Sequence, residues 1–73
     1  MSWDRLSPEL RALIEEVCTE KQINVLKLKA AGVSTRGIAR VLDVDPVTVR
    51  GHLERAYKRI RARADDLSAL HPR

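Results

Sequence analysis

Apolar residues recur every three or four positions in four separate stretches of the chain, and short polar segments lie between them. This spacing is that of amphipathic helices, and no stretch alternates apolar and polar residues as a half-buried strand would. The pattern predicts an all-α fold with four helices near residues 8–17, 20–31, 35–42 and 46–68. At 73 residues, the chain is predicted to be one domain, 1–73, with a small core.

Each predicted helix begins at a side chain that can cap it. Thr19 and Gln22 have the spacing of a capping box, in which each side chain satisfies a backbone N–H near the other residue. Gly32 can end the second helix in the left-handed conformation. The capping residues are Ser7, Thr19, Ser34 and Asp45, and prolines follow the first and the last of them.

The third and fourth predicted helices are joined by a turn so short that together they predict a helix-turn-helix, with its core at residues 34–54. Ala39 is small enough to let two steeply crossing helices approach closely. Val44 is expected to pack into the core between them. The inner face of the third helix is predicted to consist of Ile38, Ala39, Val41 and Leu42, and the inner stripe of the fourth of Val49, Leu53, Ala56, Ile60, Ala64 and Leu67.

Four segments carry a family resemblance: TEKQINVLKLKAAGVS, IARVL, TVRGHL and AYKRI. In this order and spacing the chain resembles the DNA-binding domain of LuxR-type (GerE-like) regulators and, less closely, region 4 of bacterial sigma-70 factors. Asp43 stands where the LuxR-type pattern usually has glycine, and Gly37 where it often has glutamate. The last predicted helix continues without the break of that pattern, as in sigma region 4. The resemblance implies a bacterial or phage transcription regulator that binds specific double-stranded DNA sequences.

The net charge of +4 is unevenly distributed. Residues 1–31 carry five acidic and five basic side chains, whereas residues 32–73 carry five acidic and nine basic ones. A basic excess on the half that holds the helix-turn-helix favours a polyanionic partner, and DNA is the first candidate. A solvated basic face that only keeps the protein soluble would give the same count.

The first turns of the fourth helix are expected to enter the major groove, because a recognition helix meets base edges with its N-terminal residues. Arg50 can donate two hydrogen bonds to guanine, and apolar atoms of Val47 and Thr48 can meet a thymine methyl. Gly51 would let the helix approach closely. The candidate base-reading residues are therefore Val47, Thr48, Arg50 and Gly51.

Other basic residues are candidates for contacts to the DNA backbone, namely Arg36, Arg40, His52, Arg55, Lys58 and Arg59. The two on the third helix are placed to meet phosphates, because that helix crosses the backbone in a helix-turn-helix. Alternatively, these two arginines and the basic residues after position 54 face solvent and make no contact with DNA. His52 matches the histidine of the LuxR-type pattern, which implies packing or a phosphate contact.

A homodimer is expected, because one recognition helix reads only about 4–6 base pairs. The candidate dimer surface consists of Trp3, Leu6, Leu67 and Leu70, for which a small core has little room. Trp3 has the alternative role of a lid over the core. A second reading of the whole chain is a sigma-region-4-like adaptor that binds RNA polymerase or another regulator and has weak DNA affinity, because Asp43, Asp45 and Glu54 would repel phosphates.

We expect no enzymatic activity, no cofactor and no metal site, because the sequence offers no nucleophile–base pair, ligand set or phosphate-binding loop. Cys18 is the only cysteine, which excludes an intrachain disulfide and fits a reducing cytoplasm. The sequence shows neither a signal peptide nor a segment that could span a membrane. The expected location is cytoplasmic.

Overall fold

The computed structural model describes residues 3–70, and the side chains of residues 3–67. A short 3₁₀ helix, η1 (Trp3–Arg5), precedes four α-helices, which are α1 (Pro8–Val17), α2 (Glu20–Ala30), α3 (Thr35–Leu42) and α4 (Pro46–Leu70). The all-α fold and the four helices are confirmed, and each predicted boundary lies within two residues of the observed one. The described residues contain no strand.

Three of the four predicted capping residues, Ser7, Thr19 and Ser34, act as the sequence indicates. The Gln22 N–H donates to Thr19 Oγ1 at 3.2 Å, and the Thr19 N–H donates to Gln22 Oε1 at 2.9 Å, which completes the capping box. Ser7 and Ser34 cap α1 and α3 through their hydroxyl oxygens. α2 ends at Gly32 (φ +91°), where the Val33 N–H reaches back to the Leu28 carbonyl at 3.1 Å.

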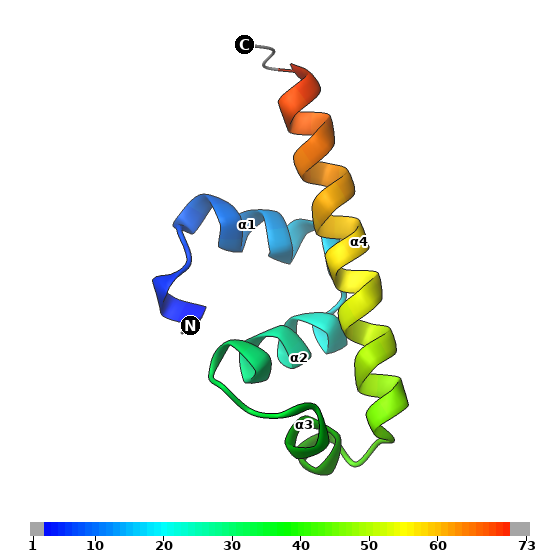
Figure 1. Cartoon of the computed structure of the whole chain (residues 1–73). Helices are drawn as coiled ribbons and strands as arrows, with labels where there is room; N and C mark the ends of the chain where they lie inside the picture. Colours follow the sequence, from blue (N-terminus) through cyan, green and yellow to red (C-terminus); the bar gives the residue numbers. More distant parts are fainter. Residues whose placement is uncertain (1–2, 71–73) are drawn as a thin grey trace.

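Helix α4 is the long axis of the molecule, and α1, α2 and α3 all pack against it (Figure 1). α2 contacts the other three helices. The core contains residues from all four helices, namely Ile14, Val25, Leu26, Ile38, Ala39, Val49, Leu53 and Ala56. The side chains of Val25, Ile38, Val49 and Ala56 are fully buried.

The apolar stripe of α4 leaves the core after Ile60. Ala64 and Leu67 are exposed, contrary to the predicted stripe. The reason is visible in Figure 1, where the C-terminal end of α4 projects beyond α1 and has no neighbouring helix. α4 is nevertheless one continuous helix, as the uninterrupted sequence predicted.

Candidate nucleic-acid interface

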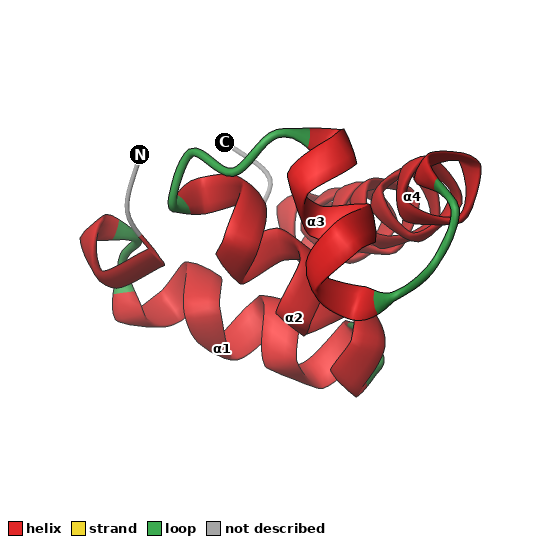
Figure 2. Ribbon diagram, turned by 90° about the horizontal axis from the view of Figure 1, so that it is seen from below, coloured by secondary structure: helices red, strands yellow, loops and turns green. Residues whose placement is uncertain are grey.

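Helix α3, the turn at residues 43–45 and the start of α4 lie together at one end of the molecule (Figure 2). Ile38 and Ala39 of α3 and Val49 and Leu53 of α4 are buried in the same core. Ala39 is only 4% exposed, which fits its predicted role at a close helix crossing. This packing fixes α3 relative to the first two turns of α4.

The turn is built on a left-handed aspartate. Asp43 has φ 55° and ψ 50°, a conformation that glycine adopts freely and that aspartate tolerates better than most residues. The Val44 N–H donates to the Ala39 carbonyl at 2.9 Å and closes the end of α3. Asp43 therefore does the work of the glycine that is usual in the LuxR-type pattern.

Two valines near the turn are more exposed than predicted. Val44 is 38% exposed and Val41 is 65% exposed, although both were expected to face the core. The Schellman-type ending of α3 rotates the chain at Asp43, so that Val44 lies at the rim of a small hollow with Leu42 and His52 instead of between the helices. The inner face of α3 is thus narrower than the sequence indicated.

The first turns of α4 separate buried and exposed residues cleanly. Val49 and Leu53 face the core, whereas Val47, Thr48 and Arg50 are exposed. Val47 is 75% exposed. The structure therefore places the four candidate base-reading residues within the first six residues of α4, on either side of the buried Val49, with Gly51 half-buried among them.

Some of the candidate residues for contacts to the DNA backbone have exposed side chains, whereas others contact other parts of the protein. Arg36 and Arg40 on α3 and Lys58 on α4 are exposed. His52 is half-buried and lines two hollows, one with the turn residues Leu42 and Val44 and one with the N-terminus of α2. This position fits the packing role that the family pattern implied for the histidine.

Arg55 folds back along its own helix. Its terminal nitrogens Nη1 and Nη2 lie 3.3 Å from the point where a Gly51 side chain would begin. Residues at i and i+4 share one helix face, so the missing Gly51 side chain makes room for this guanidinium. Gly51 was expected to leave space for DNA beside Arg50, and in the free protein Arg55 covers it.

Arg59 holds the end of α1. Its Nη1 donates to the Val17 carbonyl at 3.2 Å, which satisfies one of the carbonyls that a helix C-terminus leaves open. The same guanidinium lies near Cys18 and lowers the pKa of that thiol, but partial burial is the larger effect, so the net pKa of Cys18 is raised. Sequence reasoning assigned Arg59 to DNA and missed this contact, because the two residues are 42 positions apart.

One further pair joins α1 to α4. Arg63 Nη2 lies 3.3 Å from Glu16 Oε1, and both side chains are largely accessible to solvent. Exposed ion pairs of this kind contribute little to stability, about 0–1 kcal/mol. Together with Arg59 the pair shows that part of the basic run on α4 serves the contact with α1.

Among the candidate dimer residues whose side chains are described, Leu67 lies apart from Trp3 and Leu6. Trp3 and Leu6 are half-buried beside Tyr57 and Ile60, and the Trp3 ring lies 5.3 Å from the Lys27 ammonium. Leu67 is 38% exposed on the projecting end of α4. The side chain of Leu70 lies outside the described residues.

Acidic side chains also border the reading surface. Asp43 and Asp45 in the turn and Glu54 on α4 are all exposed. Within residues 3–70 no helix is long and apolar enough to cross a membrane. Among the same residues no group of three or more His, Cys, Asp and Glu side chains is arranged to hold a metal ion.

Comparison with known proteins supports the interpretation of this end of the molecule as a helix-turn-helix. The family model for bacterial regulatory proteins of the luxR family matches residues 16–69, which is well over half of the chain and includes α2, the helix-turn-helix and almost all of α4. No curated protein matches the chain, and no solved structure does. The matched segment begins near the end of α1, so η1 and most of α1 lie outside it.

Proposed function

Because the chain belongs to the luxR family of bacterial regulatory proteins, a family of DNA-binding transcription regulators, we propose that it binds specific double-stranded DNA sequences through α3 and α4. The observation that carries this proposal is the accessible start of α4. Val47, Thr48 and Arg50 are exposed there while the opposite side of the same turns is fixed in the core. A rigid helix with polar and apolar groups at its exposed N-terminal end is what major-groove reading requires.

Arg50 is the proposed reader of a guanine, through two hydrogen bonds to its major-groove edge. Val47 and Thr48 would contact thymine methyl groups. Gly51 becomes available to DNA when Arg55 swings outward, because only the flexible end of that side chain covers it. Arg55 then moves from its own helix to a flanking phosphate.

The remaining basic residues are proposed to hold the DNA backbone. Arg36 and Arg40 would contact phosphates from α3, and His52, Lys58 and Arg59 from α4. Arg59 can do so only in part, since its Nη1 already donates to the Val17 carbonyl. These contacts set affinity and position, and they carry no sequence information.

A binding series on DNA selected from a random pool tests the proposal. Affinity for the selected site should fall steeply between about 50 and 200 mM salt, because neutralising several phosphates releases bound counterions. Arg50→Ala should relax the preference for the selected site at a cost of about 1–3 kcal/mol. Arg40→Ala is the matched control and should weaken all sequences about equally. Unchanged discrimination in Arg50→Ala would remove Arg50 from the reading set.

A second function is a sigma-region-4-like adaptor that binds RNA polymerase or another regulator. The observation in its favour is the exposure of Asp43, Asp45 and Glu54 beside the reading surface, because carboxylates there repel phosphates. The two functions separate experimentally. An adaptor would select no DNA sequence and show no salt-dependent binding, and it would bind purified bacterial RNA polymerase holoenzyme in a sedimentation assay.

A homodimer in the bacterial cytoplasm completes the proposal. Paired half-sites one helical turn apart would double the sequence that one α4 can read. The free C-terminal end of α4, with Leu67 exposed, supports a contact between two copies at that end. Trp3 and Leu6 are left out of this contact, because they line a separate groove.

A further inference from the structure

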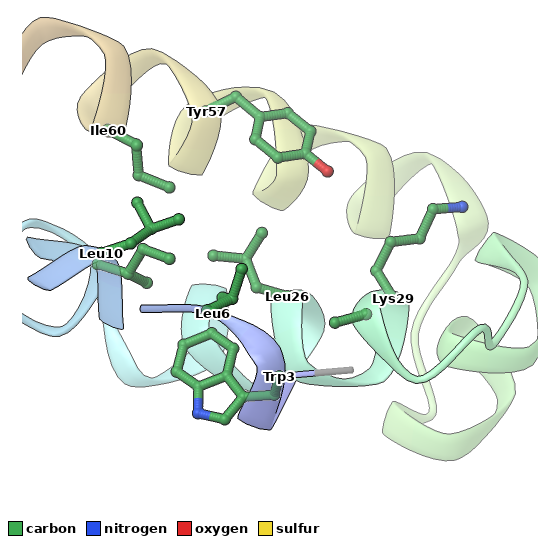
Figure 3. Close-up of a pocket in the computed structure, with 9 residues that line it drawn as sticks. Trp3, Leu6, Leu10, Leu26, Lys29, Tyr57 and Ile60 are labelled. Atoms are coloured by element: carbon green, nitrogen blue, oxygen red, sulfur yellow. The ribbon is translucent and has the colours of Figure 1, made fainter. Parts of the chain in front are cut away.

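A groove of 340 Å³ lies between η1, α1, α2 and the middle of α4. It is the hollow drawn in Figure 3, and its lining is almost entirely apolar. Its volume is within the range of small-molecule sites, about 300–1,000 Å³. The apolar lining consists of Trp3, Leu6, Leu10, Ile14, Leu26, Ala30 and Ile60.

Two polar groups of the groove, the Tyr57 hydroxyl and the Lys29 ammonium, point toward the same end of it, away from Leu10 and Ile60, whereas the indole nitrogen of Trp3 does not lie with them (Figure 3). The groove is therefore amphipathic along its length. A molecule that fills it would need an apolar body and one polar end that accepts hydrogen bonds from an ammonium and a hydroxyl.

Lys29 is free to bind such a group. The ion pair between described side chains joins Arg63 to Glu16, at a different place in the molecule. Lys27, two residues before Lys29, is occupied by its contact with the Trp3 ring. An unpaired ammonium and a hydroxyl at the same end of an apolar groove are complementary to a carboxylate.

The residues that build the groove come from two sources. Trp3, Leu6, Leu10 and Ile14 precede the segment that matches the luxR family, whereas the α2 and α4 residues lie within it. Leu10 is 36% exposed and Tyr57 is 46% exposed, so the groove is open to solvent. It is a feature that η1 and α1 add to the family domain, and its α4 residues lie about two to three helical turns beyond Arg50.

We propose that this groove binds a small amphipathic carboxylate, with the acid group between Lys29 and Tyr57 and the apolar tail along Leu10 and Ile60. Tail burial supplies most of the affinity, because it removes apolar surface of both the ligand and the groove from water. The carboxylate supplies orientation and selectivity. The site does not overlap the proposed DNA-reading surface, so it stands or falls independently of DNA binding.

Trp3 is the only tryptophan of the chain, and its fluorescence reports directly on the groove. We would titrate the whole protein with decanoate below its micelle concentration, and with decanol and decyltrimethylammonium as neutral and cationic matches. Saturable changes are expected, with decanoate binding about three- to tenfold more tightly than decanol and the cation most weakly. Far-UV circular dichroism of the same samples should show unchanged helix content.

Two variants, Lys29→Met and Ala30→Phe, test the site, and a third, Lys21→Met, is the control. Lys29→Met keeps the length of the side chain and should bring decanoate down to the affinity of decanol. Lys21→Met removes the same charge at the other end of α2 and should leave the preference intact. Ala30→Phe places a ring in the groove from α2 and should abolish binding of both decanoate and decanol while helix content is retained.

Several results would overturn the site. They are the absence of a saturable change in Trp3 emission, equal affinities for the three amphiphiles, and a loss of helix content that accompanies the fluorescence change. Trp3 emission that shifts with protein concentration alone would also overturn it, because a second copy of the chain would then cover the groove.

Discussion

A side chain at Gly37 would collide with Val33: a Cβ built there lies 2.8 Å from Val33 Cγ1 and 3.2 Å from the Ser34 hydroxyl. The Gly37 N–H also donates to that hydroxyl at 3.0 Å, so the residue serves as the partner of the α3 cap. The LuxR-type pattern often has glutamate at this position. Glycine is used in this chain because Val33 folds over the cap.

Gly37→Ala should therefore destabilise the protein, although alanine is the better helix former by about 1 kcal/mol. Val33 is β-branched and stiff, and moving it or Ser34 disturbs both the packing and the cap. We expect a net loss of about 1 kcal/mol in the free energy of unfolding, which for a domain of this size lowers Tm by about 4–8 °C. Thermal unfolding monitored by circular dichroism measures this change in Tm. A higher Tm would show that the Val33 side chain can move aside at little energetic cost.

Gly51→Ala should have the opposite effect on stability. The atoms near a Cβ at Gly51 are the terminal atoms of the Arg55 guanidinium, which can move away at little cost. The gain in helix propensity then dominates, and we expect the free energy of unfolding to rise by about 0.5–1 kcal/mol. Urea unfolding of this variant and of Gly37→Ala forms a matched pair on two helical glycines.

The same Gly51→Ala variant should bind its selected DNA site more weakly, because the added methyl group lies between the reading residues and the base edges. Higher stability with lower DNA affinity would separate the role of Gly51 at the interface from its role in folding. Unchanged DNA affinity would mean that α4 does not approach DNA closely at this position.

Local signals in the sequence predicted most of this fold because they act within one helical turn. The capping box of Thr19 and Gln22 and the glycine ending at residue 32 need only neighbouring residues to form. The same holds for the left-handed turn at Asp43. The helix-turn-helix and the exposed start of α4, which carries the candidate base-reading residues, followed from these signals and from the apolar spacing.

The remaining features depend on how helices cross, which spacing alone does not determine. Arg59 and Arg63 were assigned to DNA or solvent, yet α1 lies across α4 so that they meet Val17 and Glu16. Val41 matches the apolar period of α3 but lies beyond the strip that α2 and α4 cover, and it is 65% exposed. The groove beside Trp3 was missed for the same reason, since it exists only where α1, α2 and α4 leave a space.

Cys18 makes the stability of the folded protein depend on pH in the alkaline range. Burial raises the pKa of this thiol above its ordinary value of 9.0, and Arg59 offsets part of the rise. The folded state thus favours the neutral thiol: its contribution to stability is complete below pH 9 and is lost as the pH rises through the folded-state pKa. The free energy of unfolding should therefore fall more steeply above pH 9 in the unmodified protein than in Cys18→Ala.

Arg59→Gln supplies the second arm of that experiment. Removing the positive charge removes the part of the field that lowers the pKa of Cys18, so the thiol should titrate at a still higher pH. Thiolate absorbance at 240 nm, with Cys18→Ala as the blank, follows the titration. A lower pKa in Arg59→Gln would mean that the variant opens the junction between α1 and α2 to water.

The projecting C-terminal end of α4 is the basis of a prediction about homodimer formation. Leu67 is 38% exposed there with no helix beside it, and a dimer would place the same surface on both copies. The double change Leu67→Glu, Leu70→Glu should abolish association and leave the helix content of the monomer largely intact, because the described core ends at Ile60. Sedimentation velocity at micromolar concentration, without and with the selected DNA site, measures the effect.

The matched control is Val47→Glu, which places the same charge on the other end of α4 at a valine that is 75% exposed. This variant should leave the association intact. It should weaken DNA binding, because it brings a carboxylate close to the negatively charged DNA at the major groove. If the unmodified protein sediments as a monomer both alone and on DNA, the dimer is excluded. A single copy of α4 would then have to read its site without a symmetric partner, and Leu67 would be only an exposed residue on a free helix end.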